Sequence, residues 1–172
     1  MSTLKVGTIQ DHANSNTAMT LDGSGVGLKT SPSFLLQQSG QTTYGSGTYN
    51  EIIKTGLHTK LHDTDNAVSS AGLFTVPSGK GGIYIFSWGA TILSLGNNYV
   101  ASSLKIDGST DSTTESYFAY IGLANRPFKI TQMVQLNAGQ TVIPQALQAS
   151  GNTLSDQGNS GRKGFFGGFK IA

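Results

Sequence analysis

The chain has 172 residues, which is enough for about one domain of typical size plus a short extra segment. Glycine is abundant, at 23 residues, and charged residues make up only 12% while apolar residues make up 37%. Apolar content at this level excludes a chain that stays disordered, and helices favour Ala, Leu, Glu and Lys over the Gly, Ser, Thr and Asn that dominate here. Short strands joined by tight turns suit this composition, so we expect an all-β fold.

The net charge is small and its sources are scattered. Eleven basic against nine acidic residues give a formal charge of +2, and only Arg162 and Lys163 are adjacent in sequence. A nucleic-acid surface needs a basic stripe, so we expect no nucleic-acid partner. Without cysteine there is no disulfide, thiolate metal site or cysteine nucleophile. No apolar run approaches about 18 residues and the start of the chain lacks a signal peptide's apolar core, so we expect no membrane insertion.

Residues 1–31 differ from the rest of the chain. They contain three strand-like pieces separated by the polar turns 11–16 and 22–25. Each piece has about two apolar side chains, too few to offset its ordering entropy alone, so we expect it to fold against copies of itself or a partner. We interpret the segment as an anchor, with 30–33 as the boundary. Its apolar contacts would be Leu4, Val6, Ile9, Met19, Leu21, Val26 and Leu28.

Residues 34–172 show turn signals at the short spacing of a β-sandwich. The apolar run 83–95 (IYIFSWGATILSL) is the longest in the chain and is the best candidate for a central strand buried on both sides. Asp107-Gly108, 137–139 and 150–152 are turn sequences. Ten strand-like segments, some of them short, fit an antiparallel jelly roll of about eight strands. The strand-like segments are 34–36, 49–53, 57–61, 72–76, 83–95, 100–106, 117–121, 128–136, 141–147 and 165–171.

Four motifs in this region occur in the order typical of one family. The segment 72–90 (GLFTVPSGKGGIYIFSWGA) resembles the signature of C1q/TNF-like domains, and LKIDG at 104–108 is similar to their "Leu-x-x-Asn-Gly" hairpin. VQLNAGQ at 134–140 resembles their "Leu-x-x-Gly-Asp" turn, and GFFGGFKI at 164–171 their closing strand. The resemblance implies a C1q/TNF-like antiparallel jelly-roll sandwich that assembles as a homotrimer.

The N-terminus carries a second resemblance. The segments 2–11 and 18–22 are similar to the start of small structural and fibre proteins of marine and cyanobacterial tailed bacteriophages. This implies a homotrimeric knob on the virion surface, made in the host cytoplasm, released by lysis and attached through residues 1–31. The short anchor favours a capsid decoration protein; the alternative is a short tail fibre or fibre tip that contacts a host receptor or glycan.

The aromatic residues divide into two groups. Those on apolar strands are expected in the core or at the threefold axis of the trimer, where the alternation of Phe and Gly at 164–168 would allow close approach of subunits. Those nearer loops could meet a sugar or protein ligand. The first group is Tyr84, Phe86, Trp88, Phe165, Phe166 and Phe169, and the second is Tyr44, Tyr49, Tyr99, Tyr117 and Tyr120.

Polar clusters give little support for catalysis or metal binding. His58 and His62 lie too far apart on a strand to share a metal, and we expect a solvent-facing strand there with Leu57 and Leu61 pointing inward. Asp107 and Asp111 are weak candidates for an ion, but Asp107-Gly108 is also a strong hairpin signal. Asp111 and Glu115 lack the aromatic cleft of a glycosidase. We therefore expect no enzyme, no metal and no cofactor.

Overall fold

The computed structural model describes residues 8–10, 17–22, 25–28, 31–93, 96–119, 125–158, 161 and 163–172. The chain divides into two compact units, Met1–Ser31 and Pro32–Ala172. All regular elements of the described residues are β-strands, as expected from the composition. Within that described part no helix is long and apolar enough to cross a membrane.

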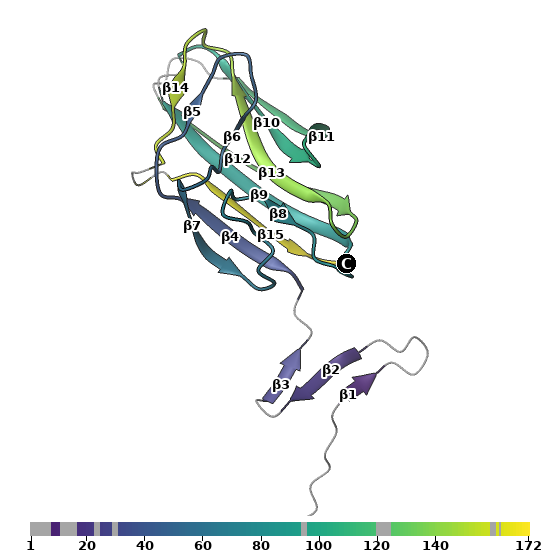
Figure 1. The fold of residues 1–172 in the computed structure, drawn as a ribbon. Helices are drawn as coiled ribbons and strands as arrows, with labels where there is room; N and C mark the ends of the chain where they lie inside the picture. The colour runs from purple at the N-terminus through teal and green to yellow at the C-terminus, as the bar shows by residue number, and fades with distance from the viewer. Residues whose placement is uncertain are drawn as a thin grey trace, which may run out of the picture. The chain divides into compact units, whose positions relative to one another are not determined.

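The first unit contains a small antiparallel sheet. Strands β1 (Thr8–Gln10), β2 (Thr17–Asp22) and β3 (Gly25–Leu28) pair in chain order (Figure 1). The register aligns Met19 with Ile9 on one side and with Leu28 on the other, and it aligns Leu21 with Val26. The sheet therefore brings five of the seven expected anchor residues onto paired strands. Leu4 and Val6 lie outside the described residues.

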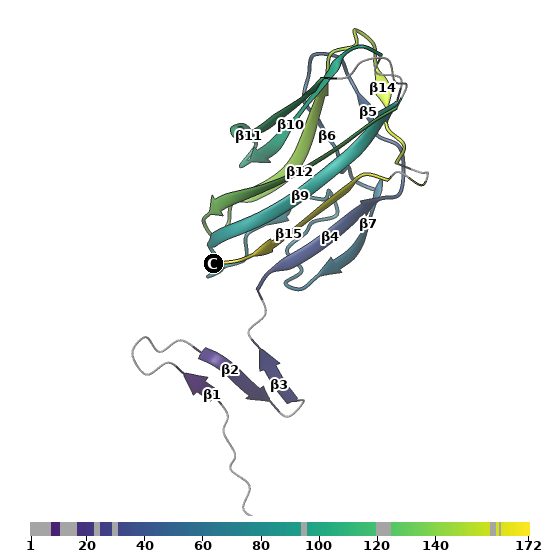
Figure 2. The same cartoon turned by 180° about the vertical axis from the view of Figure 1, so that it is seen from behind.

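The second unit is a sandwich of two antiparallel sheets, seen from opposite sides in Figures 1 and 2. One sheet has the order β12-β9-β15-β4-β7, and the other has the order β11-β10-β13-β6 with β8 also paired to β13. The first sheet comprises β4 (Ser33–Gln38), β7 (His58–Asp63), β9 (Gly82–Leu93), β12 (Asn125–Leu136) and β15 (Phe165–Lys170). The second comprises β6 (Asn50–Glu51), β8 (Phe74–Thr75), β10 (Tyr99–Ile106), β11 (Ser109–Ala119) and β13 (Thr141–Gln148). A further pair joins β5 (Thr43–Tyr44) to β14 (Leu154–Ser155).

Two strands differ from the sequence expectation. The turn Asp107-Gly108 has positive φ at both residues (48° and 81°), which suits a tight hairpin turn, so β11 begins directly after it at Ser109 rather than near Tyr117. On β7, a register irregularity where it pairs with Leu35 and Leu36 leaves Leu61 exposed. The expectation that Leu61 points inward is therefore wrong.

The core between the sheets is rich in aromatic side chains. On β9, Tyr84, Phe86 and Trp88 are fully buried. The Phe34 ring stacks on Phe74 at 4.7 Å between centroids and meets Phe166 edge-on at 4.8 Å. Burial of these large rings removes much apolar area from water and so stabilises the fold.

This packing places four of the six strand aromatic residues in the core, one of their two expected places, and not at the threefold axis. Tyr84, Phe86, Trp88 and Phe166 have no exposed surface within a single protomer, so they cannot form a subunit contact. The Trp88 indole donates to the Ser102 hydroxyl at 2.9 Å, which further fixes the ring inside the protomer. Of the six residues, Phe165 is half-buried and Phe169 is exposed.

The glycines of β15 and the residue before it also serve the protomer itself. A Cβ at Gly168 would lie 2.5 Å from the Phe86 ring, and one at Gly164 would overlap the Gln38 side chain. These contacts are too short for any side chain, so both positions need glycine for packing within one chain. The expected role in close approach of subunits is therefore not needed to explain them.

A buried carboxylate near β5 and β14 ties together segments far apart in sequence. Asp156 is fully buried, and its Oδ2 accepts hydrogen bonds from the Gln38 amide at 2.6 Å and the Tyr44 hydroxyl at 2.9 Å. Its Oδ1 accepts from the backbone N–H groups of Thr42 at 2.9 Å and Gly158 at 3.0 Å. Four donors offset the cost of removing this charge from water. Burial and the Asp156 charge raise the pKa of Tyr44 well above its usual value, so the phenol stays protonated as a donor.

Candidate functional site

The outward side of the β12-β9-β15-β4 region carries exposed apolar side chains. Met133 on β12 is 69% exposed and Phe169 on β15 is 48% exposed, with Leu35, Ile83 and Ile171 also exposed nearby. Ile85 is half-buried between them. We call this set the outer apolar face; its members are Leu35, Ile83, Ile85, Met133, Phe169 and Ile171.

The strand register places these residues in rows across the sheet. Met133 pairs with Ile85, and Ile85 pairs with Phe169. In the neighbouring row, Thr131 pairs with Ser87, followed by Gly167 and Leu35. Neither row contains a charged residue. An exposed apolar surface that lacks charged residues is typical of a surface that binds another protein chain.

Only one member of this face was predicted from the sequence. Phe169 was among the expected subunit contacts, whereas the other five were not: Leu35, Ile83, Ile85, Met133 and Ile171. The expectation that the strand at 83–95 is buried on both sides is wrong for its first half. There Ile83 is exposed and Ile85 and Ser87 are half-buried, because they alternate with the buried aromatic residues and point the other way.

Two of the expected ligand-contact tyrosines lie together on the other sheet. Tyr99 on β10 and Tyr117 on β11 are exposed, with ring centroids 5.9 Å apart. A hydrogen bond to Glu115 raises the pKa of Tyr117. These two residues remain available to a partner.

Two of the other three expected tyrosines, Tyr44 and Tyr49, are not part of that pair. Tyr44 is fully buried and bonded to Asp156, so its expected role in ligand contact is wrong. Tyr49 is half-buried, with its hydroxyl enclosed and unpaired in the structure. Tyr120 lies outside the described residues.

The polar clusters are used in local structure. Asp107 accepts from the Gln140 amide at 2.7 Å and the Thr141 N–H at 2.8 Å, bonds that lower its pKa, while Asp111 accepts from Thr113 on the same strand. His58 bonds to the Lys54 carbonyl and His62 to the Ser33 hydroxyl. Among the described residues, no three His, Cys, Asp or Glu side chains group closely enough to hold a metal.

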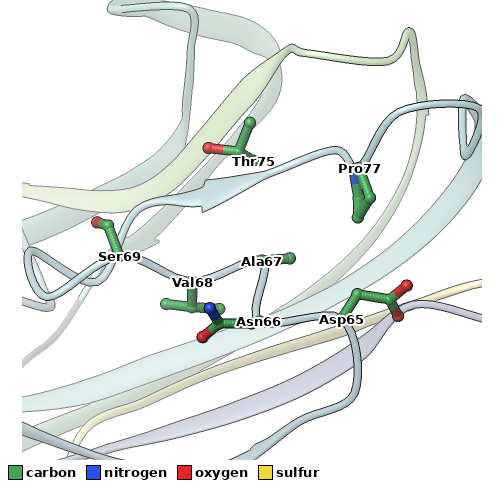
Figure 3. A pocket seen from close by; sticks show the side chains of 7 residues that line it. All are labelled: Asp65, Asn66, Ala67, Val68, Ser69, Thr75 and Pro77. Carbon is green, nitrogen blue, oxygen red and sulfur yellow. The ribbon is translucent and has the colours of Figure 1, made fainter.

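An open hollow of about 410 Å³ lies between the loop after β7 and strand β8 (Figure 3). It is lined by Asp65, Asn66, Ala67, Val68, Ser69, Thr75 and Pro77. Asp65 is its one ionisable side chain and already accepts a bond from Thr64. The other polar groups of the lining are the Asn66 amide and the hydroxyls of Ser69 and Thr75, so no second ionisable side chain of the lining stands beside Asp65.

No protein-family model and no curated protein matches the chain by sequence. Solved structures do resemble it. The globular domain of zebrafish complement 1qA aligns with a TM-score of 0.53 at 17% identity, covering 82% of this chain and 98% of that one. The Eiger TNF of S. frugiperda aligns with a TM-score of 0.60 at 10% identity, covering 84% and 94%. The PRD1 vertex protein P5 aligns with a TM-score of 0.52 at 13% identity, covering 83% and 99%. These likenesses, together with the two antiparallel sheets, confirm the expected fold: a C1q/TNF-like jelly roll.

Proposed function

We propose that the chain is a non-enzymatic structural protein of a bacteriophage virion, a homotrimeric surface knob attached to the capsid through residues 1–31. The outer apolar face carries this proposal. Its rows of exposed, uncharged side chains need a covering surface, and two further copies of the same chain supply one in a closed assembly. The structural likeness to a vertex protein, PRD1 P5, supports a place in a virion.

Light scattering of the purified chain tests the trimer. Three chains of 18.0 kDa should give about 54 kDa at micromolar concentration. Met133→Glu places a charge at the most exposed side chain of the outer apolar face and should yield a folded monomer. Tyr117→Glu is the matched control, because Tyr117 is 66% exposed but lies on the other sheet, and it should stay trimeric. A wild-type monomer, or a Met133→Glu trimer, would contradict the assignment of this face.

The first unit is the proposed attachment segment. In its β1-β2-β3 sheet the chain reverses direction at each turn, so the segment spans less distance than an extended chain of the same length. A short segment suits a protein that binds directly to a capsid surface. The fragment 32–172 should fold and assemble as a trimer but fail to bind virions that lack the protein, whereas the full chain should bind. If the fragment decorates virions as well as the full chain does, residues 1–31 are not the attachment segment.

A short tail fibre or fibre tip that contacts a host surface protein or glycan is the second candidate function. The exposed pair of Tyr99 and Tyr117 favours it, because paired aromatic rings on a surface are common in recognition sites. The number of copies per virion separates the two functions. Hundreds of chains that follow the capsid lattice indicate decoration, whereas a few trimers in multiples of the tail symmetry indicate a fibre.

A further inference from the structure

The charges of the last third of the sequence are strongly asymmetric. From Ser116 to Ala172 the sequence has a single acidic residue, Asp156, whose carboxylate is buried. The same stretch has five basic residues: Arg126, Lys129, Arg162, Lys163 and Lys170. Because the one acidic residue contributes no charge to the surface, basic residues of this stretch have no acidic neighbours in sequence to neutralise them.

One of these lysines, Lys163, lines a hollow in the first sheet, and Lys129 pairs with Gly89, another residue of the lining. The hollow has a volume of about 280 Å³ and is lined by Gly89, Ala90, Thr91, Pro127, Phe128, Lys163 and Phe165. Lys129 on β12, Gly89 on β9 and Phe165 on β15 form one row across the sheet. The Lys129 ammonium lies 5.7 Å from the centre of the Phe165 ring. We call this place the lysine hollow.

The floor of the lysine hollow depends on Gly89. A Cβ there would overlap the Phe128 carbonyl oxygen, so the sheet admits no side chain at this position. The absence of a side chain leaves a depression between Lys129 and Phe165, the residues that flank Gly89 in the row. The depression is thus a consequence of close strand packing at a glycine.

The lining has the chemistry of an anion site with an apolar wall. Within the described residues, neither Lys129 nor Lys163 has a carboxylate within 4.0 Å. Phe165 and Pro127 provide ring surfaces, and Thr91 provides a hydroxyl-bearing side chain. Charge complementarity therefore points to a ligand that combines a carboxylate with a partly apolar ring and hydroxyl groups.

We propose that the lysine hollow binds a carboxylate-bearing sugar, such as one uronic acid unit of an acidic surface polysaccharide. Its volume is at the lower edge of the roughly 300–1,000 Å³ of drug-sized ligand sites, which suits a single ring. Lys163 and Lys129 bind the carboxylate, while Phe165 and Pro127 pack against the C–H face of the ring. The inference goes beyond the proposed function, since it depends only on the protomer and not on where the protein sits in a virion.

Titration calorimetry of the full chain at low salt tests the proposal. Trigalacturonate should bind once per chain, its methyl ester should not bind, and added salt should weaken the binding. Lys129→Met combined with Lys163→Met should weaken it at least tenfold, because charge-assisted bonds are lost while the aliphatic stems remain. Lys170→Met is the control for each single lysine substitution, since it removes one positive charge from the other end of β15 and should leave the affinity within twofold.

Three results would overturn the proposal: no binding of trigalacturonate, equal loss in the lysine pair and in Lys170→Met, or equal binding of triglutamate or inorganic phosphate. The last result would mean that the surface attracts anions without recognising a sugar. Light scattering of each variant keeps the two proposals separate. A chain that is monomeric yet binds trigalacturonate contradicts the trimer alone, and a trimer that does not bind contradicts the lysine hollow alone.

Discussion

Replacing Asp156 with asparagine should be among the most destabilising conservative substitutions in the protein. The carboxylate accepts four hydrogen bonds inside the sandwich, and it joins Gln38, Thr42, Tyr44 and Gly158. Asparagine has nearly the same shape but offers one oxygen and one NH₂ group. If the asparagine oxygen still accepts hydrogen bonds from the Thr42 and Gly158 N–H groups, its NH₂ group faces the NH₂ group of Gln38. Two donors then meet and no hydrogen bond forms between them.

The neighbours of Gln38 prevent a simple rearrangement. Its Oε1 accepts from the Gly164 N–H at 2.7 Å and its Nε2 also donates to the Ile52 carbonyl at 2.8 Å. Turning the Gln38 amide over, so that it accepts from the NH₂ group of the introduced asparagine, would break both bonds. Loss of a hydrogen bond to a charged group costs about 1.5–3 kcal/mol, and an unsatisfied buried donor adds about 1–3 kcal/mol. We expect a loss of about 3–4 kcal/mol in the free energy of unfolding.

Urea unfolding at one fixed protein concentration measures this loss, because assembly also contributes to apparent stability. Asp65→Asn is the control, since Asp65 accepts one local bond from Thr64, and it should change stability by less than about 1 kcal/mol. Tyr44→Phe in the wild type and in Asp156→Asn completes a double-mutant cycle that should show coupling. A loss below about 1 kcal/mol for Asp156→Asn would refute the view that this carboxylate organises the end of the sandwich.

Two further substitutions test local packing and charge. Burial acts to raise the pKa of Asp63, but hydrogen bonds from Lys60, Ala67 and Val68 outweigh it and lower the pKa below 3.8. The stability this provides is present above about pH 4 and is lost as the pH falls through the folded pKa. Asp63→Asn should therefore be less stable than the wild type in urea at about pH 7, and the difference should shrink as the pH falls below about 4. Gly168→Ala should lose about 1–3 kcal/mol in the same assay, because its Cβ would press on the Phe86 ring, while Gly161→Ala, with open space around it, should lose less than about 1 kcal/mol.

The sequence was informative about strands and turns because these depend on neighbouring residues. The alternation in β9 and the Asp107-Gly108 turn both follow from local backbone geometry. Local backbone geometry does not determine which face of a strand points into the core. Both sets of β9 residues are apolar, Ile83 and Ile85 on one side and Tyr84, Phe86 and Trp88 on the other, so alternation alone does not reveal which set is buried. The larger aromatic set fills the sandwich because it removes more apolar area from water.

Contacts between residues far apart in the sequence could not be predicted for a different reason. Tyr44 lies 112 residues from Asp156, and nothing in the local composition around either residue indicates that they meet. Tyr44 therefore looked like an exposed loop residue, although it is a buried donor. The lysine hollow is similar. Lys129 and Lys163 lie far apart in sequence, and the sheet brings β12, which carries Lys129, and β15, which follows Lys163, to either side of Gly89.

The two sites proposed for the first sheet must occupy different parts of it. Met133 and Lys129 lie four residues apart on β12, about 13 Å along the strand, so the apolar rows and the lysine hollow are neighbours that do not coincide. A closed symmetric contact can cover the apolar rows without burying charged groups. Covering three copies of the hollow would bring lysine ammonium groups close together, and these repel one another. We therefore expect Met133→Glu to separate the subunits and still bind trigalacturonate within about threefold of the wild-type affinity in calorimetry. If binding disappears together with the trimer, the hollow is completed by a neighbouring subunit, and the division of the sheet argued here is wrong.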